Sequence, residues 1–65
     1  MTLAKKSRRH HYKISVYFND GNEREFDYID WCKLDLDHNL IIMCSSPDLT
    51  YINYSSVSYI DVVQR

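Results

Sequence analysis

Short runs in which apolar and polar residues alternate, each ended by a tight-turn sequence, constrain this chain more than any other feature. From Tyr12 to Phe18 the residues alternate and are mostly β-branched or aromatic, which is typical of a half-buried strand. Further strand-like runs cover 22–29, 32–36, 40–45, 49–53 and 57–63. No helical period extends beyond one turn. The pattern therefore predicts an all-β protein.

The first turn contains Gly21, the only glycine of the chain. A two-residue loop would bring a glutamate onto the core face, whereas a three-residue loop over 19–21 with a left-handed Gly21 keeps apolar residues together. The register that follows pairs Ile14 with Phe26, Tyr12 with Tyr28 and Lys13 with Asp27. We therefore predict the three-residue loop.

A second three-residue turn is predicted at 37–39, because Asn39 tolerates the left-handed conformation. The register that follows aligns Leu36 with Leu40, Leu34 with Ile42 and Cys32 with Cys44 on one face. Ile41 and Met43 then fall on the opposite face. The strand 40–45 would be apolar on both sides, so it is either central in its sheet or covered by a partner.

The remaining turns and one long strand define the expected architecture. Residues 46–49 suit a type I turn with Pro47 at its second position, and 54–56 suit a short turn or a single 3₁₀ turn. The strand from about Glu23 to Leu36 should bend near Asp30-Trp31. We predict a small antiparallel barrel of five or six strands, or a strongly bent sheet, over residues 12–65. A short, flexible, basic arm over residues 1–11 precedes it.

This order of strands and turns resembles that of SH3-like and Sm-like barrels. Asp20-Gly21, then Asp35 and Asn39, then Ile52-Asn53 before the last strand are similar to an Sm-type pattern. The glycine inside the second strand and the Arg-Gly pair of the RNA-binding loop are absent. The resemblance therefore implies an analogy of fold and no family.

The length of 65 residues limits the classes of function. A core this small rarely supplies more than about 3–5 kcal/mol, and little chain is left to build a rigid catalytic cleft. The sequence has no Gly-rich phosphate loop and no nucleophile motif. Metal-ligand spacing is also absent among the soft ligands His10, His11, Cys32, His38 and Cys44. We expect no enzyme, metal or cofactor, and two buried cysteines, which a secreted protein could oxidise to a disulfide.

Charge is divided along the chain. Five of its eight basic residues precede Ile14: Lys5, Lys6, Arg8, Arg9 and Lys13. From Ile14 onward nine acids and three bases give a net charge of −6. The basic arm either binds the phosphates of a nucleic acid, remains a solvated tail, or folds back on the acidic body.

Acidic and aromatic residues provide the candidate binding surface. Six acids lie within one 15-residue stretch: Glu23, Glu25, Asp27, Asp30, Asp35 and Asp37. The first three would share an outer strand face about 7 Å apart, which approximates the phosphate spacing of one nucleic-acid strand. This face is either a nucleic-acid mimic that occupies a basic groove of another protein or an ordinary solvated strand face.

Aromatic side chains are numerous for so small a domain. Exposed rings serve as protein-interface anchors or as stacking platforms for bases, and the candidates are Tyr17, Trp31, Tyr51 and Tyr59. The predicted registers also leave apolar residues on outer faces: Tyr17, Ile29, Ile41, Met43, Tyr59 and Val63. A homodimer or higher homo-oligomer would bury them.

Three functions follow from these features. We expect first a protein-binding module or inhibitor of the kind that phages and mobile elements encode, acting on a basic, nucleic-acid-handling partner. The alternatives are a nucleic-acid-binding protein that uses the arm and the aromatics, and a self-assembling structural subunit. Ile, Asn, Lys and Tyr, which have AT-rich codons, total 20 residues, whereas Ala, Gly, Pro and Arg, which have GC-rich codons, total 7. This bias in composition predicts a protein of a low-GC bacterium, phage or plasmid. No apolar run approaches the roughly 20 residues of a membrane span, so we expect the protein to be cytoplasmic.

Overall fold

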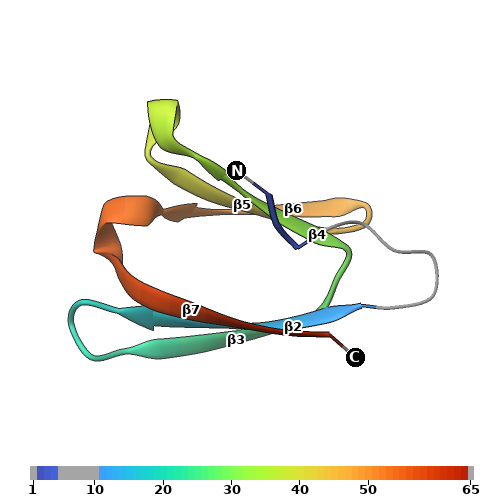
Figure 1. The fold of residues 1–65 in the computed structure, drawn as a ribbon, viewed down its shortest axis with the longest axis horizontal. Coiled ribbons are helices and arrows are strands. Elements are labelled where there is room, and N and C mark those ends of the chain that lie inside the picture. Colours follow the sequence, from blue (N-terminus) through green and yellow to red (C-terminus); the bar gives the residue numbers. More distant parts are fainter. Residues whose placement is uncertain (1, 5–10, 65) are drawn as a thin grey trace.

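Strands make up most of the computed structural model, which describes residues 2–4 and 11–64. The elements are β1 (Thr2–Ala4), β2 (Tyr12–Phe18), β3 (Glu23–Ile29), β4 (Trp31–Asp35), the 3₁₀ turn η1 (Leu36–His38), β5 (Leu40–Ser45), β6 (Asp48–Asn53), the 3₁₀ turn η2 (Tyr54–Ser56) and β7 (Val57–Gln64). They form two antiparallel sheets, ordered β1-β4-β5-β6 and β3-β2-β7, which lie one over the other as two layers (Figure 1). The prediction of an all-β protein is confirmed.

The chain crosses from one sheet to the other at Asp30. β3 ends at Ile29 in one sheet and β4 begins at Trp31 in the other. The position of the predicted bend therefore agrees, but it separates two strands instead of bending one. The barrel alternative is wrong, because the ladders of the described strands form two separate sheets. A second crossing, at η2, carries the chain from β6 to β7 and leaves these two strands in different sheets (Figure 1).

The first hairpin has the predicted turn. Gly21 N–H donates to the Phe18 carbonyl (3.0 Å), Phe18 N–H donates to the Asn22 carbonyl (2.8 Å), and Gly21 has a φ of 91°. This left-handed backbone suits glycine because it has no Cβ. Ile14 lies opposite Phe26, so the three-residue loop and its register are confirmed here.

Further along the same hairpin a β-bulge changes the register. Tyr12 lies opposite Ile29, so the predicted pair of Tyr12 with Tyr28 is wrong. Two residues, Asp27 and Tyr28, oppose the single residue Lys13, and Tyr28 has a φ of 56°. A bulge reverses the alternation of a strand. Tyr28 is therefore 68% exposed, whereas Ile29, expected on an outer face, is buried.

The second hairpin is shifted by one residue from the predicted register. Asp35 lies opposite Leu40 and Cys32 opposite Met43, so the turn has four residues, 36–39, and contains η1. Asp35 caps this turn by accepting a hydrogen bond from His38 N–H (3.3 Å). As a result Leu36, expected in the core, is 61% exposed.

The shift also reverses the faces of β5. Ile41 and Met43, expected on an outer face, are buried between the sheets. Cys32 and Cys44 are not opposite each other, and both are free thiols. Cys32 is buried as expected, whereas Cys44 is only partly buried because it lies on the outer face of β5.

Of the last two turns, the first differs from the prediction and the second agrees with it. Ser45 lies opposite Asp48, so Ser46 and Pro47 form a two-residue loop with a cis peptide bond between them. The predicted type I turn beginning at Ser46 is therefore wrong. The 3₁₀ turn over 54–56 is confirmed, and Asn53 caps it by accepting from Ser55 N–H (3.0 Å).

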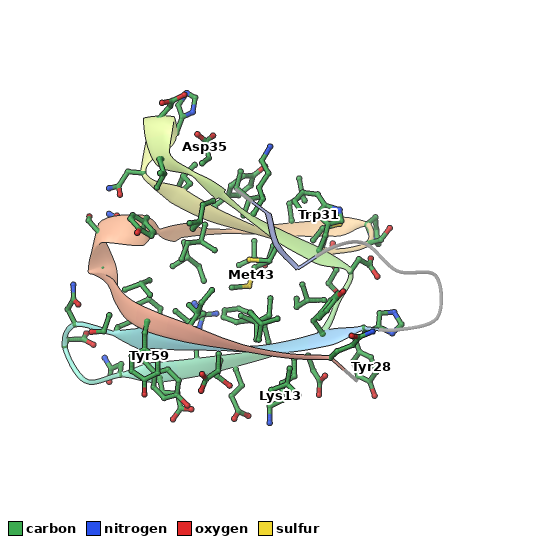
Figure 2. The ribbon with its side chains drawn as sticks, in the orientation of Figure 1. Lys13, Tyr28, Trp31, Asp35, Met43 and Tyr59 are labelled. Carbon is green, nitrogen blue, oxygen red and sulfur yellow. The ribbon has the colours of Figure 1, made fainter. Side chains whose placement is uncertain are left out.

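The hydrophobic core lies between the two sheets, and Met43 stands at its centre (Figure 2). Its buried members are Ile14, Val16, Ile29, Cys32, Ile41, Met43 and Ile52. Full burial of side chains of this size stabilises a fold by about 1.5–3 kcal/mol each. The core therefore draws on both sheets and fixes which residues are left to face outward.

The observed register of β4 and β5 predicts that two substitutions change the free energy of unfolding by very different amounts. Met43→Ala should lower the free energy of unfolding by about 2–5 kcal/mol, because it opens a cavity between the sheets. Leu36→Ala, at an exposed position, should change it by less than about 0.5 kcal/mol. Urea denaturation followed by Trp31 fluorescence measures both. A large loss for Leu36→Ala with a small one for Met43→Ala would favour the three-residue turn instead.

Candidate protein-binding face

The outer face of the β3-β2-β7 sheet gathers acidic and tyrosine side chains. The ladders place Tyr17 between Glu23 and Tyr59, and Ser15 between Glu25 and Asp61. Because the intervening residues of β2 are buried in the core, these residues face away from it. We call the set Tyr17, Glu23, Glu25, Asp27, Tyr59 and Asp61 the acidic face. Figure 2 shows Lys13 and Tyr59 on the side of this sheet opposite to Met43.

Two stacked tyrosines occupy one end of the acidic face. The ring centroids of Tyr17 and Tyr59 lie 4.4 Å apart with an interplanar angle of 15°. Cross-strand aromatic pairs of this kind hold both rings in place. More than half of the Tyr59 side chain is exposed. The pair therefore presents an ordered aromatic surface to solvent.

The environment of Tyr17 is negative. A hydrogen bond with the Glu23 carboxylate raises the pKa of Tyr17 above its usual value of 10.0, and burial and the nearby Glu23, Tyr59 and Asp61 raise it further. The Tyr17 hydroxyl is thus held in its neutral, hydrogen-donating form.

Carboxylates outnumber cations on this surface. Glu23, Glu25, Asp27 and Asp61 face outward with one ammonium group, that of Lys13, among them. Lys13 Nζ lies 3.4 Å from Glu25 Oε1. The face therefore has a net charge of −3 and attracts cationic groups.

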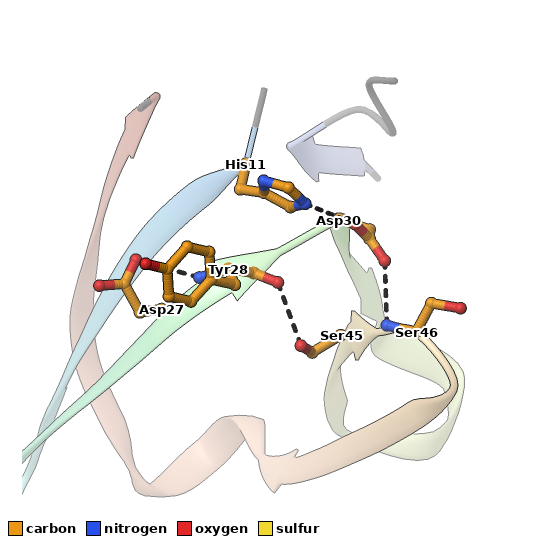
Figure 3. Close-up of polar contacts among 6 residues, drawn as sticks. All are labelled: His11, Asp27, Tyr28, Asp30, Ser45 and Ser46. Carbon is orange, nitrogen blue, oxygen red and sulfur yellow. Dashed lines mark hydrogen bonds and ion pairs between the residues drawn. The ribbon is translucent and has the colours of Figure 1, made fainter. Parts of the chain in front are cut away.

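The other predicted acids lie elsewhere. Asp30 stands at the crossing between the sheets, where Oδ2 accepts from Ser46 N–H (2.9 Å) and Oδ1 lies 3.5 Å from His11 Nε2 (Figure 3). The pKa of Asp35 is lowered, chiefly by its hydrogen bond with the His38 ring, and Asp37 is exposed in η1. Asp30 and Asp35 therefore hold turns together, and the predicted acid row is divided.

The predicted aromatic residues are also divided. Tyr17 and Tyr59 lie on the acidic face, whereas Trp31 and Tyr51 lie on the outer face of the β1-β4-β5-β6 sheet. Sequence reasoning missed Asp61, which follows Tyr59 at the two-residue spacing that places strand residues on one face. It also missed Tyr28, which the bulge exposes next to Asp27 (Figure 3).

Most of the predicted nucleic-acid arm lies outside the described residues. This applies to Lys5, Lys6, Arg8 and Arg9. Thr2–Ala4 of the same segment form β1, which pairs with β4. Lys13, the last residue of the predicted set, lies beside Glu25 rather than on a basic surface.

The Cys32 thiol is buried between the sheets. Burial raises the pKa of Cys32 to about 11, so its thiol stays protonated at neutral pH and is a poor nucleophile. Within the part of the chain that the structure describes, no group of three or more His, Cys, Asp or Glu gathers to hold a metal ion.

The comparisons with known proteins leave this surface to be interpreted from its own chemistry. No protein-family model matches the chain, and no significant match was found among curated proteins or among solved structures. In addition, none of the described helical segments is long and apolar enough to cross a membrane.

The contact between Tyr17 and Glu23 predicts a measurable titration. Glu23→Gln should lower the pKa of Tyr17 towards 10.0, because it removes both the anionic acceptor and its charge. In the unchanged protein the stability from this contact is complete below about pH 10 and is lost as the pH rises through the raised pKa. NMR of the Tyr17 ring carbons across pH measures the shift. Glu25→Gln is the control, and an equal pKa in all three proteins would contradict the contact.

Proposed function

We propose that this chain is a small, non-enzymatic protein-binding module that recognises a basic partner through its acidic face. The stacked pair of Tyr17 and Tyr59 among outward carboxylates is the observation that carries the proposal. Tyrosine is enriched among the residues that dominate binding energy at protein interfaces, and little side-chain entropy is lost when it is already ordered. The carboxylates around the pair would steer a cationic surface towards it.

A protein that handles nucleic acids fits this face best. Glu23 and Glu25 alternate along β3, which places them about 7 Å apart, close to the phosphate spacing of a single strand. A Lys- or Arg-rich groove that normally holds phosphates would accept such a row. The chain would then act as an inhibitor of the kind that phages and mobile elements encode.

The fold supports a role in binding. We propose that its strand order is that of SH3-like and Sm-like small barrels, on the evidence of the break between strands at Asp30 and the 3₁₀ turn before β7. The acidic face argues against direct binding of nucleic acid, since it repels a polyanion. An arm that binds phosphates remains the alternative function.

Charge reversal on the acidic face should abolish partner binding. The full chain is immobilised and exposed to extract of a low-GC bacterium, and captured proteins are identified by mass spectrometry. We expect basic nucleic-acid-binding proteins that elute with salt and are displaced by duplex DNA. Glu23→Lys combined with Glu25→Lys should reduce their capture at least tenfold, which corresponds to about 1.4 kcal/mol.

The matched control carries the same change in net charge away from the acidic face. Asp37→Lys combined with Asp48→Lys, both at exposed positions, should retain capture. Equal loss in both double variants would indicate a nonspecific charge effect and contradict the proposal. Fluorescence anisotropy with labelled single-stranded and duplex oligonucleotides tests the alternative. Tight, salt-sensitive binding of either by the chain itself would favour the nucleic-acid function.

A further inference from the structure

The outer face of strands β4, β5 and β6 is apolar. Three cross-strand rows face outward on it: Trp31, Cys44 and Leu49; Lys33, Ile42 and Tyr51; and Asp35, Leu40 and Asn53. We call the six residues Trp31, Leu40, Ile42, Cys44, Leu49 and Tyr51 the apolar face. Figure 2 shows Trp31 on the side of this sheet away from Met43. The face is therefore separate from the core.

Solvent reaches two of the six residues of this face freely, and the other four are partly buried. Tyr51 is 57% exposed, and Leu49 is nearly as accessible, although both lie on strand β6 beside other apolar side chains. Contiguous exposed apolar surface of this kind marks an interaction site in a soluble domain. The acidic face lies on the other sheet, so the two surfaces are on opposite sides of the molecule.

The net charge of the apolar face is compatible with a second copy of this chain as its occupant. Its rows contain one cation, Lys33, and one carboxylate, Asp35, which gives a net charge of zero. Two acidic faces would repel each other, whereas two apolar faces meet without that penalty. A second copy of this chain therefore fits the apolar face.

We propose that two copies pack through their apolar faces about a two-fold axis. The axis runs parallel to β5 and lies between the apolar face of one copy and that of the other. This rotation places β4 of one copy over β6 of the other and sets each row against the same row. Lys33 then lies over the partner's Tyr51, as in a cation–π contact. Asp35 faces the partner's Asn53, and Trp31 packs on the partner's Leu49.

The alternative two-fold axis, across the strands, is less favourable. It places β4 over the partner's β4 and brings Lys33 against the partner's Lys33, so that like charges meet. The axis along β5 avoids this repulsion. Ile42 and Cys44 then meet their own copies near the axis, as apolar side chains do where aligned sheets pack about 10 Å apart.

The dimensions of the face predict a weak dimer. Three strands about 4.8 Å apart and five residues long at about 3.4 Å each give a footprint of about 14 by 17 Å. Two such footprints cover roughly 500 Å² in total, which is below the size of a standard specific interface and in the range of weak, transient ones. We therefore expect a weak dimer that dissociates in the high micromolar range or above.

Sedimentation velocity over a series of protein concentrations tests the interface. The unchanged chain should form a concentration-dependent dimer, and Tyr51→Lys should weaken it at least tenfold by setting a lysine against the partner's Lys33. Val63→Lys is the matched control, since Val63 is 56% exposed on the other sheet and should leave the dimer intact. Circular dichroism confirms that each variant is folded.

Mixing two variants tests the axis itself. Lys33→Glu and Tyr51→Lys should each self-associate poorly. Their equimolar mixture should recover dimerisation close to that of the unchanged chain, because the introduced glutamate and lysine meet in the mixed dimer. A monomer at all concentrations, or a mixture that stays monomeric, would overturn the proposal. The proposal would also be overturned if the unchanged chain stays monomeric and captures another protein that the Tyr51→Lys variant no longer captures.

Discussion

Hydrogen bonds at Asp30 hold the point where the chain leaves one sheet and enters the other. Its N–H donates to the Cys44 carbonyl (2.7 Å), and its carboxylate accepts from Ser46 N–H (2.9 Å). These contacts fix the end of β3 against the end of β5. The first residue of β4, Trp31, is thereby set opposite Cys44, and the remaining β4–β5 pairs follow in order. This register places Ile41 and Met43 in the core.

The same register decides what the protein presents to solvent. With alternate residues of β4 and β5 buried, Trp31, Ile42 and Cys44 are left on the outer side. The first hairpin does the same for the tyrosines and carboxylates of the other sheet. Two outer faces of different character result, one acidic and one apolar. A dimer formed through the apolar faces would leave both acidic faces free for partners on opposite sides of the assembly.

Local patterns in the sequence were sufficient for some parts of this structure. Alternation identified strands β2 to β7 but not β1, which lies in the segment predicted to be a flexible arm. Gly21 identified the first turn, and the length of the run through Asp30 indicated the bend. The register of β4 and β5 was not predictable from alternation, because a three-residue and a four-residue turn each leave a plausible strand face. The capping of η1 by Asp35 accompanies the longer turn. The bulge at Asp27 and Tyr28 carries no glycine that would have indicated it.

The candidate site was likewise predictable only in part. Tyr17, Tyr59, Glu23 and Glu25 come together because the first hairpin has the predicted register near its turn. Asp35, Asp37, Trp31 and Tyr51 are separated from them because the chain changes sheet at Asp30. Residue spacing in the sequence does not distinguish a crossing between two sheets from a corner of one barrel.

Cross-strand nuclear Overhauser contacts in the isotope-labelled full chain test whether the register set at Asp30 creates the apolar face. The observed register predicts contacts joining the backbone of Cys32 to Met43 and that of Lys33 to Ile42. Contacts joining Cys32 to Cys44 and Leu34 to Ile42 would contradict it. That register would place Ile41 and Met43 outside and remove the apolar face as described.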